Sequence, residues 1–143
     1  VIELSLTPMD EHTIPAFTPF TLNDQLSIRS AGLTWDSGTQ LRLTVYWEAT
    51  QPITQNYSVA VHLLASNSTE LAQPIPAQAD ATHPVENWYP TTQWQAGEIV
   101  RDIYTLQVPD INAAVAVRVA LYYVDSQAQL VNSQWLYLPV PPR

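Results

Sequence analysis

The sequence of 143 residues predicts an all-β protein, an antiparallel β-sandwich of about eight strands with an immunoglobulin-like or jelly-roll-like arrangement. Short segments alternate apolar and polar residues with a period of two, as a strand with one buried face requires. Clusters of turn-forming residues separate these segments, and twelve prolines, many at segment ends, oppose long helices. The chain is also large enough, and apolar enough at 46% hydrophobic residues, to bury a core.

Four segments show the strand alternation most clearly. In the first, Leu41, Leu43, Val45, Trp47 and Ala49 share one face, so we expect Trp47 to be a structural core residue. The four clear strands are expected at residues 40–49, 57–65, 100–108 and 115–123. Weaker patterns predict further strands at residues 2–6, 25–35, 70–75 and 131–138.

The segments between the expected strands divide into tight turns and two long irregular stretches. Asp36-Ser37-Gly38-Thr39 is typical of a hairpin turn, and residues 66–69 and 125–128 resemble it. The longest strand-free stretch, residues 76–98, predicts a functional loop or a structural cap, and residues 7–24 form a second irregular stretch. We expect one domain over residues 1–138, followed by a Pro-rich tail or linker at 139–143.

Composition excludes several classes of function. The chain has no lysine and no cysteine, which excludes Schiff-base chemistry, a P-loop lysine, a thiolate zinc site and a cysteine nucleophile. Its formal net charge is −8 and its five arginines are scattered, so nucleic acid is not expected as a partner. The longest apolar run, residues 113–124, is shorter than the roughly 20 residues needed to cross a bilayer. We therefore expect no direct membrane insertion.

The most unusual segment runs from Trp88 to Glu98 and contains two tryptophans, a tyrosine and one of only three glycines. Such a segment either presents aromatic rings to a ligand or closes the end of a sandwich. We expect Trp94 to be the closing residue and Gly97 to make the turn into the next strand. For Trp88 and Tyr89 both alternatives remain open, and in the first they form a platform on which a sugar ring stacks.

Asp102 and His62 are the two ionisable residues that the strand pattern singles out. Alternation places Asp102 on a buried face, where its carboxylate needs a partner, either loop amides or an arginine. We expect it to fix the long loop, so that Asp102→Ala destabilises the fold. His62 has no second histidine at ligand spacing, which favours a single hydrogen-bonded histidine over a metal ligand.

No catalytic, metal or cofactor site is predicted. The sequence contains no nucleophile elbow, P-loop or dinucleotide fingerprint, and it pairs no carboxylates at a spacing that indicates glycoside hydrolysis. The segment Asp10-Glu11-His12 offers oxygen ligands for calcium, but it has no EF-hand pattern. We therefore expect a protein that is not an enzyme and that uses no cofactor.

The middle of the chain resembles a known extracytoplasmic domain. The matching pieces are residues 43–49, 52–53, 57–64, 89–98, 100–106 and 119–122, within a region of roughly residues 40 to 125. As an ordered set they are similar to the C-terminal β-sandwich domain of bacterial membrane proteins described as dolichyl-phosphate-mannose-type glycosyltransferases. The resemblance implies a non-catalytic domain on the outer face of a membrane, and it supplies no ligand or catalytic residue.

Together these patterns predict a non-catalytic, extracytoplasmic accessory domain of a membrane-associated, glycosyltransferase-like protein. In one version the domain binds carbohydrate, and Trp88, Tyr89, Tyr46 and Glu48 contact the sugar. In the alternative it is a structural spacer or a protein–protein docking module of the cell envelope. The expected partner is a glycan in the first version and an envelope protein in the second.

Overall fold

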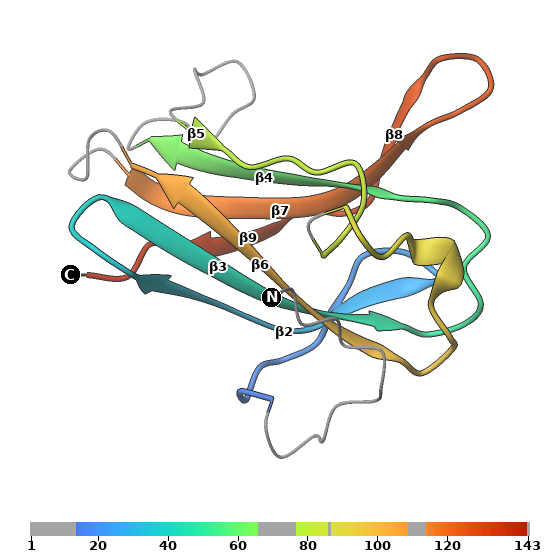
Figure 1. The fold of residues 1–143 in the computed structure, drawn as a ribbon, viewed down its shortest axis with the longest axis horizontal. Helices are drawn as coiled ribbons and strands as arrows, with labels where there is room; N and C mark the ends of the chain where they lie inside the picture. The colour runs from blue at the N-terminus through green and yellow to red at the C-terminus, as the bar shows by residue number, and fades with distance from the viewer. Residues whose placement is uncertain (1–13, 66–76, 86, 109–113, 143) are drawn as a thin grey trace.

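The computed structural model describes residues 14–65, 77–85, 87–108 and 114–142, which form two antiparallel sheets (Figure 1). The first sheet has the order β1 (Phe20–Thr21), β2 (Leu26–Trp35), β3 (Gln40–Ala49) and β6 (Ile99–Gln107). The second has the order β5 (Ala77–Gln78), β4 (Ser58–Ala65), β7 (Ala114–Val124) and β8 (Leu130–Asn132), and β9 (Leu136–Pro139) also pairs with β7. The predicted all-β sandwich is confirmed.

All four clearly predicted strands are present, as β3, β4, β6 and β7, and the weaker segment 25–35 is β2. The segment 131–138 was expected to be one strand but is divided into β8 and β9. The division lies at Ser133, whose backbone N–H donates to Leu121 O at 2.8 Å while its side-chain oxygen accepts from Leu121 N–H at 3.0 Å. This side-chain bond interrupts the backbone ladder. The expected strands at 2–6 and 70–75 lie outside the described residues.

Two of the predicted turns join neighbouring strands. Between β2 and β3 the Asp36 N–H donates to Gln40 O at 2.9 Å. Between β7 and β8 the carboxylate of Asp125 accepts from the N–H groups of Gln127 and Gln129, each at 2.9 Å. These turn predictions succeed because Asp side chains bond to backbone groups close by in the sequence. The third predicted turn, at 66–69, lies outside the described residues.

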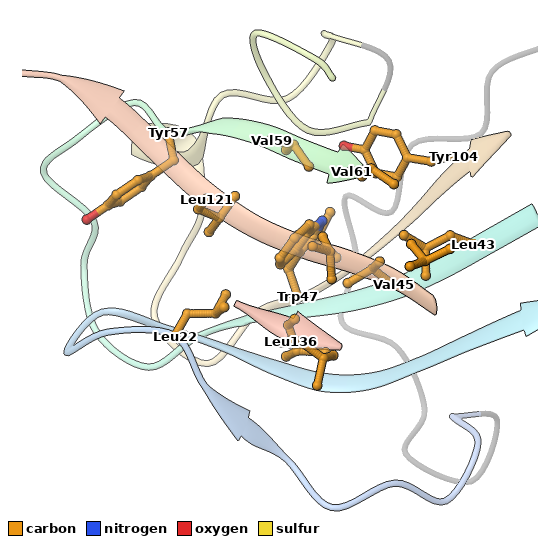
Figure 2. Close-up of a cluster of buried hydrophobic side chains, with 14 of the residues drawn as sticks. Leu22, Leu43, Val45, Trp47, Tyr57, Val59, Val61, Tyr104, Leu121 and Leu136 are labelled. Carbon is orange, nitrogen blue, oxygen red and sulfur yellow. The ribbon is translucent and has the colours of Figure 1, made fainter. Parts of the chain in front are cut away.

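The core lies between the two sheets, and the strand alternation supplies it. Figure 2 shows Trp47 in the middle of the cluster, with Val45 from its own sheet and Leu121 from the facing sheet. Trp47 is fully buried, and each large apolar side chain buried in this way stabilises the fold by about 1.5–3 kcal/mol. At one margin of the sandwich Trp35 Nε1 donates to Pro141 O at 2.8 Å. Residues 140–141, expected to belong to a tail or linker, are thus joined to the sandwich.

The chain between β5 and β6 crosses from the second sheet to the first. It starts along β4, where Ala79 N–H donates to Val61 O and Ala81 N–H to Val59 O, each at 2.9 Å. It ends at Gly97, whose N–H donates to the carbonyl of Ala49 in β3 at 2.7 Å. This segment includes the 3₁₀ helix η2 (Thr91–Gln93). It covers one end of the sandwich as it passes from one sheet to the other. We call residues 83–98, without residue 86, the cap.

Candidate functional site

The cap is anchored by the buried carboxylate of Asp102, which is 2% exposed. Its Oδ2 atom accepts from Trp47 Nε1 at 3.0 Å and from the Tyr104 hydroxyl at 2.5 Å, and its Oδ1 accepts from Val85 N–H at 3.0 Å. Burial raises the pKa of Asp102, and these hydrogen bonds oppose that rise. Of the two kinds of partner expected from the sequence, the loop amide is present, and two aromatic side chains bond to the carboxylate beside it.

The turn that Asp102 holds has an unusual backbone. Val85 and Asn87 have φ angles of 54° and 69°, in the left-handed region that a β-branched valine rarely adopts. Asn87 bonds twice to His83, through its N–H to the His83 carbonyl and through its side chain to the His83 N–H. Trp88 N–H then donates to Val85 O at 2.9 Å. This fixed turn presents the side chain of Trp88, which is 60% exposed.

The second half of the cap is a buried plug built on Glu98. The Tyr89 hydroxyl donates to Glu98 Oε2 at 2.8 Å, and the Gln95 N–H donates to Glu98 Oε1 at 2.9 Å. Trp94 Nε1 donates to the Tyr89 carbonyl at 3.1 Å, and the two rings lie 5.9 Å apart. Burial raises the pKa of Tyr89 to about 12, and the hydrogen bond and negative charge of Glu98 add to this rise.

Burial separates the residues that the sequence grouped together. Trp94 is 4% exposed and Gly97 has a φ of 85°, so they occupy the closing and turning positions expected of them. Tyr89 is buried in the core cluster, so the expectation that its ring face meets a sugar is wrong. The physical reason is the hydroxyl bond to buried Glu98, which turns the ring inward.

Tyr46 and Glu48 lie on the outer face of the first sheet. They alternate with Trp47, whose side chain points into the core. Tyr46 is buried on this outer face beside its register partners Ser30 and Arg101. Because Tyr46 and Tyr89 lie on opposite sides of this sheet, the four residues expected to contact sugar do not form one platform. Of the four, Trp88 presents an exposed aromatic face.

The outer face of the second sheet carries a cluster that the sequence did not indicate. Arg118, 4% exposed, directs Nε and Nη2 at His62 Nδ1 at 3.1 and 3.0 Å and lies 4.2 Å from the centre of the Trp135 ring. Asp80 lies on the other side of the imidazole, 3.4 Å from Nε2. Burial lowers the pKa of His62; the Asp80 charge opposes this and the Arg118 charge adds to it. The cluster joins β4, β7, the chain after β5 and the chain before β9, and it has a structural role.

Metal and membrane features are not found in the part of the chain that the structure describes. No group of three or more metal-ligating side chains comes together among these residues. No helix within them has both the length and the apolar character needed to cross a bilayer. The calcium candidate, Asp10-Glu11-His12, lies outside the described residues.

A pocket of about 540 Å³ opens at one end of the sandwich. Its walls come from the β1–β2 turn, the β3–β4 loop and the chain around β8, and we call it the end pocket. Figure 2 shows Tyr57 at the margin of the core cluster, with its hydroxyl directed away from Trp47. The lining residues are Leu22, Asn23, Asp24, Gln25, Gln51, Thr54, Gln55, Tyr57, Tyr123, Val131, Asn132, Ser133 and Gln134.

The end pocket was not predicted from the sequence. Among the described residues that line it, six carry carboxamide side chains, and these come from three turns far apart in the chain, at residues 23–25, 51–55 and 132–134. An excess of Asn and Gln in turns is a visible signal, but a polar turn is also the ordinary composition of an exposed loop. Only the sheet order brings the three turns to one end.

Comparisons with protein-family models, with curated proteins and with solved structures found no significant match to this chain.

Proposed function

We propose that this domain is a non-catalytic carbohydrate-binding module, an accessory extracytoplasmic part of a membrane-associated, glycosyltransferase-like protein. The observation that carries the proposal is the exposed indole of Trp88 on a turn that a buried carboxylate fixes. The backbone of Trp88 is hydrogen-bonded to Val85 while its indole is exposed, and an exposed flat ring suits a ligand with one flat apolar face. A pyranose ring has such a face.

The rigidity of the turn favours binding. The bond from Val85 N–H to Asp102 and the paired bonds between Asn87 and His83 hold the backbone on both sides of residue 86. A backbone that is ordered before the ligand arrives loses little conformational entropy on association. Stacking on one indole contributes on the order of 1 kcal/mol, so we expect weak binding that a repeated or membrane-anchored ligand strengthens.

The extracytoplasmic part of the proposal is supported by composition and by the resemblance described above. A chain without cysteine is compatible with an oxidising compartment, and its charge of −8 disfavours nucleic acid and anionic lipid surfaces. The resemblance adds the membrane-associated glycosyltransferase context.

A glycan titration followed by tryptophan fluorescence tests this function. We expect neutral oligosaccharides to change the emission of the native chain, because Trp88 is exposed while Trp47 and Trp94 are buried. Trp88→Ala should remove most of this change, weaken affinity roughly threefold to tenfold and leave stability within about 0.5 kcal/mol. Tyr137→Ala is the matched control, since Tyr137 is a 50% exposed aromatic residue of β9. Equal loss in both variants, or no response to a broad glycan panel, would contradict the proposal.

The alternative, a docking module of the cell envelope, is favoured by a different observation. Val124 and Leu130 are register partners across the β7–β8 hairpin and are 57% and 60% exposed. Figure 1 shows this hairpin projecting from the body of the sandwich. Exposed apolar pairs on a projecting hairpin are typical of protein contacts. This alternative predicts that no glycan changes the fluorescence of the native chain.

A further inference from the structure

We propose that the end pocket is a second ligand site, and that it takes a neutral sugar through its carboxamide side chains. This inference rests on the proposed carbohydrate-binding function, but it does not depend on Trp88. The argument comes from four properties of the pocket: its preformed walls, its unused hydrogen-bonding groups, its charge, and its size.

The walls of the end pocket are held by hydrogen bonds within the protein. Asn23 Oδ1 accepts from the N–H groups of Gln25 and Leu26 at 2.9 and 3.0 Å, and Asn23 Nδ2 donates to the Tyr57 hydroxyl at 3.1 Å. Gln51 Nε2 donates to the Asp24 carbonyl at 2.7 Å, which joins the β3–β4 loop to the β1–β2 turn. These bonds fix the two loops that form the walls, so the shape of the pocket exists before a ligand binds.

Other polar groups of the pocket are not used within the described part of the protein. The side-chain amides of Asn132 and Gln134 have no hydrogen-bond partner among the described residues, and the Tyr57 hydroxyl, which accepts from Asn23, keeps its proton to donate. Each amide offers donors and an acceptor side by side. A sugar hydroxyl also both donates and accepts, so adjacent hydroxyls match such amides in a way that apolar ligands do not.

The charge of the pocket selects against acidic ligands. Asp24 is its one carboxylate, and neither an arginine nor a histidine lines it among the described residues. Burial raises the pKa of Tyr57, so this ring stays neutral near pH 7. An anionic sugar that enters the pocket of this chain, whose net charge is −8, loses part of its hydration. No cationic side chain among the described lining residues offsets that cost.

The size and lining of the pocket fit a short oligosaccharide. Its volume of about 540 Å³ lies within the range of small-molecule sites, about 300–1,000 Å³. Most such sites are lined by apolar side chains, but here the apolar and aromatic lining is limited to Leu22, Val131, Tyr57 and Tyr123 among the described residues. The two tyrosine rings pack edge to face with centroids 5.6 Å apart. A mostly polar lining with two aromatic rings suits a ligand with many hydroxyls.

Calorimetric titration of the whole 143-residue chain tests the inference. The probes are neutral oligosaccharides of glucose, galactose, mannose and N-acetylglucosamine, with oligogalacturonate as the acidic counterpart. We expect at least one neutral probe to bind at least about tenfold more tightly than the acidic one. The double variant Asn132→Ala, Gln134→Ala should weaken that binding by about tenfold, because each lost bond costs several-fold. Gln127→Ala, an exposed amide on the β7–β8 turn outside the pocket, should leave it unchanged.

The variants separate failure of this site from failure of the carbohydrate function. If Trp88→Ala weakens sugar binding and the double variant does not, the domain binds sugar and the end pocket does not, which overturns the inference alone. If no sugar binds to any variant, both proposals fail. Tight binding of the acidic probe, or of a neutral peptide such as tetra-alanine in place of sugars, also overturns the inference. The native chain and the double variant should have equal melting temperatures. A loss of affinity in the double variant then cannot be explained by unfolding.

Discussion

The cap and the end pocket are both built from polar and aromatic side chains, but they differ in whether the protein itself bonds to all of their polar groups. In the cap, Asp102 and Glu98 are 2% and 6% exposed, and each accepts from a backbone N–H and from an aromatic side chain. In the end pocket, Asp24, Asn132 and Gln134 are exposed, and their side chains bond to nothing in the described part of the protein. Buried polar groups here organise the fold, whereas the exposed ones remain available to a ligand.

The largest expected effect breaks the cap at its anchor. Asp102→Ala leaves Trp47 Nε1, the Tyr104 hydroxyl and the Val85 N–H without an acceptor in a buried site. Buried donors without partners cost about 1–3 kcal/mol each, so we expect a loss of about 3–5 kcal/mol and a fall in Tm of roughly 10–17 °C. Chemical and thermal denaturation measure both.

The matched control for this substitution is Asp36→Ala. Asp36 is exposed in the β2–β3 turn and lies 3.4 Å from Arg42 Nη1, an exposed ion pair expected to contribute less than about 1 kcal/mol. If the two alanine variants lose equal stability, the carboxylate of Asp102 does not anchor the cap.

A smaller effect is expected where the cap meets a wall of the end pocket. Thr91, fully buried, donates from Oγ1 to the Gln55 carbonyl at 2.6 Å and accepts from Tyr57 N–H at 3.0 Å. Thr91→Val keeps the shape of the side chain but removes both bonds, so we expect a loss of about 1–3 kcal/mol. Thr91→Ser, which retains the hydroxyl, should recover most of it. Denaturation of the two variants gives the difference in their free energies of unfolding. Equal stability of the Thr91→Val variant and the native chain would show that the bonds of Thr91 to Gln55 and Tyr57 do not stabilise the fold.

The smallest effect is a dependence on alkaline pH. The pKa of Tyr89 is raised from 10 to about 12 in the fold, so the folded chain keeps a proton that the unfolded chain loses above pH 10. Its contribution is fully present below pH 10 and is lost as the pH rises from 10 to about 12. Tyr89→Phe should therefore reduce the fall in stability over that interval. Denaturation at pH 9 and pH 11 measures it, and identical falls in both proteins would show that the fold does not raise the pKa of Tyr89.

The sequence predicted the cap better than the end pocket for a physical reason. Asp102 stands out because strand alternation is local, and a carboxylate on a buried face must find donors. Trp88 and Tyr89 are adjacent and equally aromatic, and only the position of Glu98 in space buries one and leaves the other exposed. Residues of the end pocket, such as Asn23 and Gln134, converge through sheet order, which no local pattern contains.

A chemical-shift map of the ¹⁵N-labelled chain during titration with neutral oligosaccharides tests the central claim most directly, because one spectrum reports on both regions. We predict that the Trp88 indole N–H and the side-chain amides of Asn132 and Gln134 shift on binding. The indole N–H signals of Trp47 and Trp94 should stay in place, since both donate to buried acceptors. Shifts confined to Trp47 and Trp94, or an unchanged spectrum with every sugar, would contradict the division between an organising cap and ligand-binding exposed groups.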